Sequence, residues 1–134
     1  MSGSLPQGIE TLTKLEQIYV GGNHLTGSFP TGWADLSGLK KLEMQNNRLK
    51  GTLPEVLGNL LQLEKLSLNL NQFTGEVPSS LGKLTLLKAL DLELTDLVGT
   101  MPTEICDLRG EGKPLETLVA TCEEVECSCC TRCY

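Results

Sequence analysis

Residues 63–78 read LEKLSLNLNQFTGEVP, and their pattern predicts how the chain folds. Leu66 and Leu68 alternate with polar neighbours, which is the period-two pattern of a strand with one buried face. An asparagine, a glycine and a proline follow at Asn71, Gly75 and Pro78. Asparagine and glycine are typical of turns, and proline fixes φ where no N–H donor is needed. One short strand cannot bury its apolar face alone, so the stretch must pack on copies of itself.

The chain contains such copies. Its prolines recur every 24 residues, each with a glycine three residues before it: Pro6, Pro30, Pro54, Pro78 and Pro102. The apolar positions keep the same register, as in the column Ile18, Leu42, Leu66 and Leu90. An asparagine column, Asn23, Asn47 and Asn71, ends with Thr95. We expect the asparagines to bridge neighbouring coils by amide hydrogen bonds and this ladder to be weaker at Thr95.

Each repeat reads LxxLxxLxLxxNxLxGxxPxxLxx, which resembles the plant-type subclass of leucine-rich repeats. The resemblance covers residues 3 to about 122. It implies an α/β solenoid, a right-handed superhelix with a parallel concave β-sheet, one short strand per turn, and short convex helical turns. We divide the chain into a partial repeat over 1–11, four repeats over 12–107, and a last repeat with a cysteine-rich cap over 108–134.

The two ends of the repeat array differ. The first residues already match the second half of a repeat, so we expect the chain to be a fragment whose secretion signal and earlier repeats lie upstream. Near the other end, Leu115 follows Leu108 by seven residues where other repeats need three, which predicts a surface loop over 109–114. The last strand is expected to contain Leu115, Leu118 and Ala120.

Six cysteines gather toward the C-terminus: Cys106, Cys122, Cys127, Cys129, Cys130 and Cys133. An even number in such a cluster predicts a disulfide-bonded cap in an oxidising compartment, with fifteen possible pairings. Cys106 occupies a convex position that holds glycine in earlier repeats, so we expect it to reach the tail. The alternative is a tetrathiolate zinc site, but paired CxxC motifs with a spacer are absent, so no metal is expected.

The tail pattern CxCCxxC over 127–133 is similar to the caps of surface leucine-rich-repeat proteins of diatom-like algae. This resemblance covers about 20 residues. It implies an extracellular or cell-surface location.

Composition argues against several functions. The net charge of −6 offers no basic stripe to nucleic acid and disfavours an anionic membrane, and no apolar run could span a bilayer. We therefore expect no nucleic acid and no membrane contact by this segment itself. The single histidine, His24, falls in a variable surface position, and Asp91 and Glu93 lack a dry pocket. We expect neither enzymatic activity nor a cofactor.

The strand residues that point away from the leucine core form the candidate binding surface, in three columns across the predicted sheet. The first holds Gln17, Lys41, Lys65, Ala89 and Thr117, the second Tyr19, Glu43, Ser67, Asp91 and Val119, and the third Gly21, Gln45, Asn69, Glu93 and Thr121. The predicted ligand-binding residues are Gln17, Tyr19, Lys41, Glu43, Gln45, Lys65, Ser67, Asn69, Asp91 and Glu93. Tyr19, the only aromatic residue among them, is the best anchor. Lys41 and Lys65 form a basic middle, and Asp91 and Glu93 an acidic end.

Three functions fit such a surface. The favoured one is recognition of a peptide or protein ligand by a fragment of a receptor-like or secreted surface protein. The second is inhibition of cell-wall-degrading enzymes, as by the polygalacturonase-inhibiting proteins that share this repeat. The third is a structural or adhesion role, including binding to ice, which would favour ladders of one residue type over the mixed columns found here. The sequence leaves the ligand, the disulfide pairing and the oligomeric state open.

Overall fold

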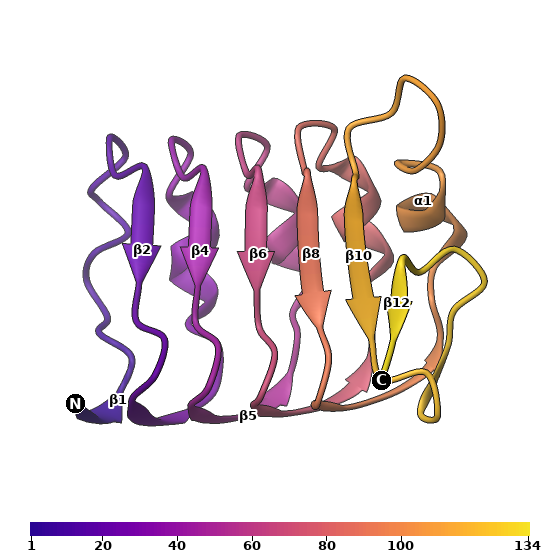
Figure 1. The fold of residues 1–134 in the computed structure, drawn as a ribbon. Helices are drawn as coiled ribbons and strands as arrows, with labels where there is room; N and C mark the ends of the chain where they lie inside the picture. The colour runs from indigo at the N-terminus through magenta and orange to yellow at the C-terminus, as the bar shows by residue number, and fades with distance from the viewer.

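The computed structural model describes residues 1–134 and consists of successive coils stacked side by side (Figure 1). The chain passes through two six-stranded sheets, and equivalent strands of successive coils are hydrogen-bonded neighbours. Every pair of neighbouring strands is parallel. The α/β solenoid expected from the repeats is confirmed.

The sheet that faces the viewer in Figure 1 is the one predicted from the leucine columns, and we call it the concave sheet. Its strands are β2 (Gln17–Tyr19), β4 (Lys41–Glu43), β6 (Lys65–Ser67), β8 (Ala89–Leu92), β10 (Thr117–Ala120) and β12 (Arg132–Cys133). Leu42, Leu66 and Leu90 lie opposite one another in its register and are fully buried. The leucines of successive coils therefore share one interior.

A second sheet follows the concave sheet in each coil, so the expectation of one strand per turn is wrong. Its strands are β1 (Ser2–Ser4), β3 (His24–Gly27), β5 (Arg48–Thr52), β7 (Gln72–Glu76), β9 (Asp96–Thr100) and β11 (Val125–Glu126). In β7 only Phe73 is buried, and Gly75 has a φ of 81°. No strand of this sheet buries more than one side chain, and β1, β3, β5, β7 and β9 each contain a glycine with positive φ. No alternating pattern therefore marks these strands in the sequence.

The convex side consists of short helical segments that begin directly after the prolines, as predicted. They are the 3-10 helices η1 (Thr31–Asp35), η2 (Glu55–Asn59) and η3 (Ser79–Lys83), and the α-helix α1 (Thr103–Cys106). Their close stacking depends on small residues. A Cβ atom on Gly58 would come within 2.4 Å of the Ser80 carbonyl oxygen, so a larger residue there would push η2 and η3 apart. None of the helical segments has the length or apolar character needed to cross a bilayer.

The asparagine column forms the expected ladder. The Asn71 amide donates to the Met44 carbonyl of the preceding coil (2.9 Å), and its Oδ1 accepts from the Leu49 N–H (3.1 Å). Thr95 instead makes one bond inside its own coil, from its hydroxyl to the Leu92 carbonyl (2.8 Å). The ladder is therefore weaker at Thr95, as predicted, because a hydroxyl is too short to join two coils.

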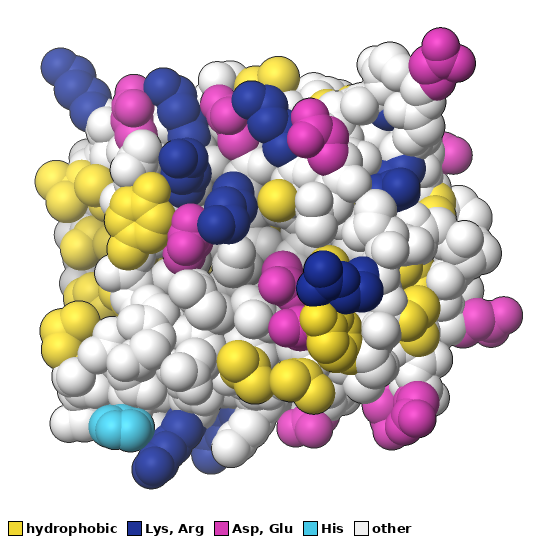
Figure 2. Space-filling view, in the orientation of Figure 1, with side chains coloured by type: hydrophobic (Ala, Val, Ile, Leu, Met, Phe, Trp, Pro, Cys, Tyr) yellow, Lys and Arg dark blue, Asp and Glu magenta, His cyan; other side chains and the backbone are white.

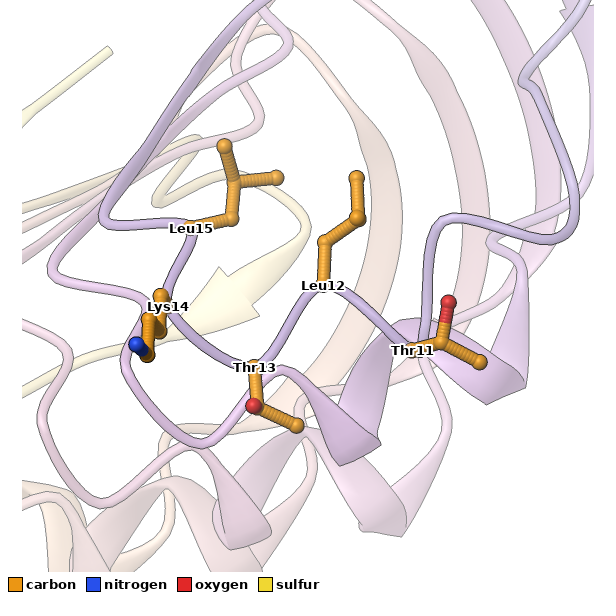
Figure 3. Close-up of a pocket in the computed structure, with 5 residues that line it drawn as sticks. All are labelled: Thr11, Leu12, Thr13, Lys14 and Leu15. Atoms are coloured by element: carbon orange, nitrogen blue, oxygen red, sulfur yellow. The ribbon is translucent and has the colours of Figure 1, made fainter.

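The N-terminal end of the stack is open. Leu12 is 52% exposed, whereas Leu36, Leu60 and Leu84, which hold the same position in later coils, are buried. A hollow lined by residues 11–15 opens here, and Figure 3 shows Leu12 and Leu15 pointing to the same side of the chain. The first coil thus presents part of its leucine layer to solvent because no coil covers its outer side.

The C-terminal end is closed by the tail, residues 122–134. β11 pairs with β9, and β12 pairs with β10. The prediction that β10 is the last strand is therefore wrong. The disulfides are Cys106–Cys129, Cys122–Cys133 and Cys127–Cys130. The predicted reach of Cys106 to the tail is confirmed. All six sulfurs are paired, so the zinc alternative has no ligands left.

Candidate binding face

Two of the three polar columns predicted from the sequence are aligned by the register of the concave sheet. Gln17, Lys41, Lys65, Ala89 and Thr117 are successive partners, and so are Tyr19, Glu43, Ser67, Asp91 and Val119. Within each column the side chains form a row, in which neighbours are about 4.8 Å apart because that is the spacing of neighbouring strands. We call the surface that these rows form, shown in Figure 2, the concave face.

The N-terminal part of the concave face carries an exposed aromatic ring. Tyr19 is 54% exposed, and its hydroxyl donates to Oε1 of Gln17 (2.9 Å). Behind it, the Gln45 side chain lies over Gly21, where a Cβ atom would come within 2.7 Å of the Gln45 carboxamide. Gly21 therefore makes room for Gln45, whose Oε1 is buried without a hydrogen-bond donor.

The middle of the concave face is less basic than its composition predicts. Lys65 forms an ion pair with Glu43 (Nζ–Oε1 2.9 Å), which leaves Lys41 as the lysine of these columns that forms no ion pair. Ser67 is buried, so it offers a partner little surface, contrary to expectation. The reason is its short side chain, which lies in a shallow hollow among longer ones. The hollow is lined by Glu43, Gln45, Lys65, Ser67, Asn69, Ala89, Asp91 and Thr117.

The acidic end consists of Asp91 and Glu93, both partly buried and neither in an ion pair. Burial raises the pKa of Asp91, against the smaller effects of the Glu93 N–H that donates to its Oδ1 (3.2 Å) and of the charges on Arg132 and Lys65. Burial and the neighbouring Asp91 charge raise the pKa of Glu93, while Arg132 lowers it. The two carboxylates are thus incompletely compensated.

The tail adds two residues to the concave face that the repeat pattern does not predict. β12 places Arg132 directly beyond Val119 in the second column, and the Tyr134 N–H donates to the Ala120 carbonyl (3.0 Å). The Arg132 guanidinium donates to the Tyr134 hydroxyl (2.8 Å) and lies 5.7 Å from the centre of its ring. Val119, expected on the surface, is buried because β12 continues the sheet beyond it. No sequence signal marks these residues, because all four residues over 131–134 are exposed and the tail does not follow the repeat.

The concave face offers hydrogen-bond donors and acceptors, two carboxylates and an aromatic ring on a rigid support. No group of three or more His, Cys, Asp or Glu side chains is placed to hold a metal ion. A continuous parallel sheet that presents rows of polar side chains to solvent defines a solenoid repeat protein with an open, elongated face.

The chain belongs to the leucine-rich-repeat family. The sequence profile described as Leucine Rich Repeat matches residues 14–36, 38–60 and 62–84, which together make up about half of the chain. No curated protein sequence matches the chain.

Solved structures extend the similarity over most of the chain. A TDR receptor is 42% identical, with a TM-score of 0.77 over 78% of this chain and 18% of its own. The Arabidopsis receptor kinase HAESA, solved with the peptide hormone IDA and the co-receptor SERK1, is 30% identical, with a TM-score of 0.80 over 90% of this chain and 20% of its own. A plant ice-binding protein is 25% identical, with a TM-score of 0.79 over 94% of this chain and 39% of its own. The chain therefore spans a fifth or less of the two receptors.

Proposed function

We propose that this chain is a recognition module that binds an extended peptide or a protein segment along its concave face. The observation that carries the proposal is the alignment of the polar columns in the register of one rigid sheet. Side chains held in rows by a continuous backbone ladder are preorganised, so a partner does not have to immobilise them on binding. A repetitive concave surface of this kind is what solenoid proteins present to their partners.

The similar structures support a peptide or protein as the partner. HAESA was solved with a peptide hormone and a co-receptor, and another similar structure, the plant receptor RGFR1, was solved with RGF2. These partners belong to those receptors. For this chain they support a peptide or a protein as the class of ligand, because the same fold presents the same kind of surface.

The similar plant ice-binding protein shows that the fold alone does not select the ligand. A flat crystalline surface favours rows of one small residue type. The rows here mix tyrosine, lysine, glutamate, serine and aspartate, so we favour a partner with varied chemistry of its own.

The proposed setting is extracellular, in a receptor-like or secreted surface protein. Three disulfides in the last coils persist in an oxidising compartment and are rare in reducing ones. Membership of a family shared with plant receptors supports the same setting.

The proposal is tested by selecting peptides from a displayed random 12-residue library against the immobilised full chain. We expect enriched peptides whose affinity falls at least tenfold with Tyr19→Ala, Lys41→Glu or Asp91→Lys on the concave face. The matched control is Lys83→Glu, an exposed charge reversal in η3 on the convex side, which should leave affinity unchanged. No enriched peptide, or equal affinity for wild type and all three concave variants, would overturn the proposal.

A further inference from the structure

Two exposed leucines occupy a backbone conformation that suits glycine or asparagine. Gly22, Asn46, Leu70 and Leu94 hold the same position in successive coils, with φ values of 70°, 56°, 56° and 50°. In this left-handed region a Cβ atom crowds the next carbonyl oxygen, so leucine is disfavoured. Leu70 and Leu94 are also 43% and 50% exposed. Neither backbone preference nor core packing therefore explains leucine at these two positions, and an exposed outlier of this kind points to function.

The tail places a third exposed apolar group along the same edge. Leu94 is hydrogen-bonded to the next coil, because its N–H donates to Oγ1 of Thr121 (2.7 Å). The residue after Thr121, Cys122, donates its N–H to the Tyr134 carbonyl of the last coil (2.9 Å). Tyr134 is 49% exposed. We call Leu70, Leu94 and Tyr134 the apolar patch. Figure 2 shows hydrophobic side chains gathered below the centre of this face, beside acidic ones.

The acidic end adjoins the apolar patch directly. Glu93 precedes Leu94 in the chain, and its carbonyl accepts the Leu70 N–H (3.0 Å). Of the nearby cations, Lys65 is paired with Glu43, whereas Arg132 donates to the neutral Tyr134 hydroxyl, forms no ion pair and keeps its charge near both carboxylates. The surface beside the apolar patch thus carries two carboxylates outside any ion pair, and the single charge of Arg132 compensates them only in part.

We propose that the apolar patch, together with Asp91 and Glu93, docks an extended peptide segment that carries a basic side chain within a few residues of an apolar one. This inference rests on the proposed function and names the chemistry of the ligand. The basic side chain would lie against the two carboxylates, and the apolar one would cover Leu70 and Leu94. Because Glu93 and Leu94 are consecutive, the two complementary groups of the ligand must also be close in its sequence.

Charge selects this partner over other occupants of an apolar surface. A symmetric pair of these patches would bring two acidic ends together, and like charges destabilise such a contact. An anionic lipid surface would be repelled by the same carboxylates and by the net charge of −6. A cationic, partly apolar peptide is attracted by both parts of the surface.

The test uses the peptides selected against the full chain and two double variants. L70N/L94N removes the exposed leucines and introduces the residue that Asn46 already provides at the equivalent position, so the backbone conformation is kept. D91N/E93Q removes both charges with little change in shape. The matched control is L61T/L86Q. It removes two leucines of similar exposure, 55% and 43%, in favour of the residues found at the equivalent positions Thr85 and Gln62.

We expect the selected peptides to share an arginine or lysine within a few residues of an apolar side chain. Their affinity, measured by fluorescence anisotropy, should fall at least tenfold in each double variant and stay unchanged in the control. Acidic or neutral selected peptides would overturn the inference. So would binding that depends on Tyr19 and Lys41 but is unaffected by both double variants, although the proposed function would survive. A concentration-dependent dimer that L70N/L94N abolishes would assign the patch to a second copy and also overturn it.

Discussion

The two ends of this solenoid are built differently. At the N-terminal end Leu12 is half exposed, whereas Leu108, which holds the same repeat position near the C-terminal end, is buried. The difference lies in the neighbours and not in the residues, since both are leucines at core positions of the repeat. In a solenoid each coil completes the core of the coil beside it, so burial depends on the next coil. An end without a neighbour loses part of its core even when its sequence matches the repeat.

The C-terminal end obtains its neighbour from a tail with few apolar residues. Within residues 122–134 only Val125 is a buried apolar side chain, and covalent links replace the missing leucines. The Cys106–Cys129 bond joins the convex side to the tail, and Cys122–Cys133 joins the ends of β10 and β12. Small structural units that cannot bury enough apolar surface are commonly held by disulfides.

The largest expected difference in stability is between two leucine-to-alanine substitutions at the same repeat position, one in a covered coil and one at the N-terminal end. Leu84→Ala should lower the free energy of unfolding by about 3–5 kcal/mol, because it opens a cavity in a closed core. Leu12→Ala should cost less than about 1 kcal/mol, because that side chain is already half solvated. Urea unfolding followed by circular dichroism measures both. Equal losses would show that the N-terminal end is covered in solution.

The loss of stability on removing a single disulfide should increase with the length of chain that the disulfide closes. Cys106→Ser with Cys129→Ser, which opens a separation of 23 residues, should cost about 3 kcal/mol. Cys127→Ser with Cys130→Ser, with a separation of 3, should cost about 1.5 kcal/mol. Thermal unfolding of the two double variants compares them. A reversed order would mean that the tail is held mainly by its packing on α1.

The asparagine ladder distinguishes the middle coils from those nearest the cap. Asn71→Thr copies the natural residue of the next coil and should cost about 2 kcal/mol, because it leaves the Leu49 N–H and the Met44 carbonyl without their partner. The amide of Leu49 should then exchange faster with deuterium. Thr95→Asn should have the opposite sign and stabilise by up to about 1 kcal/mol, by extending the ladder. A loss of stability in Thr95→Asn would contradict this account.

The smallest expected effect concerns the acidic end of the concave face. Burial raises the pKa of Asp91 in the folded state. The contribution of Asp91 to stability is therefore greatest below the pKa that it has in the unfolded chain, and it is lost as pH rises through its pKa in the folded state. Asp91→Asn should therefore stabilise the protein at pH 7 by about 0.5 kcal/mol or less, since solvent screens a half-exposed group. Near pH 2, where aspartate is protonated in both states, the wild type and Asp91→Asn should be equally stable. Destabilisation at pH 7 would show that Asp91 is well compensated.

The regular part of the fold was predictable because its signal repeats. The leucine columns, the asparagines, the glycines and the prolines each recur every 24 residues, so every position is supported several times over. Local chemistry then predicts the strand at Leu66, the ladder at Asn71 and the helical turn after Pro78. The second sheet was not predicted because its strands bury at most one residue each and leave no alternation to detect.

The candidate site was predictable only in part. The period of the repeat placed Tyr19, Glu43 and Asp91 in one column, and the register agrees. The repeat gives no information about a unique tail, so the positions of Arg132 and Tyr134 could not be inferred from it. The exposure of Leu70 and Leu94 was not predicted, because exposed leucines cannot be recognised from spacing alone.

The solenoid, its core leucines and the columns of its open face follow from the sequence alone, since period and side-chain polarity are properties of the chain. The three-dimensional structure is needed to establish which of the six cysteines are bonded to each other, how the tail continues both sheets, and which charges on the concave face stay uncompensated. The physical reason is that pairing and compensation depend on distances between segments with no common period. Burial depends likewise on the coil that lies next to each residue.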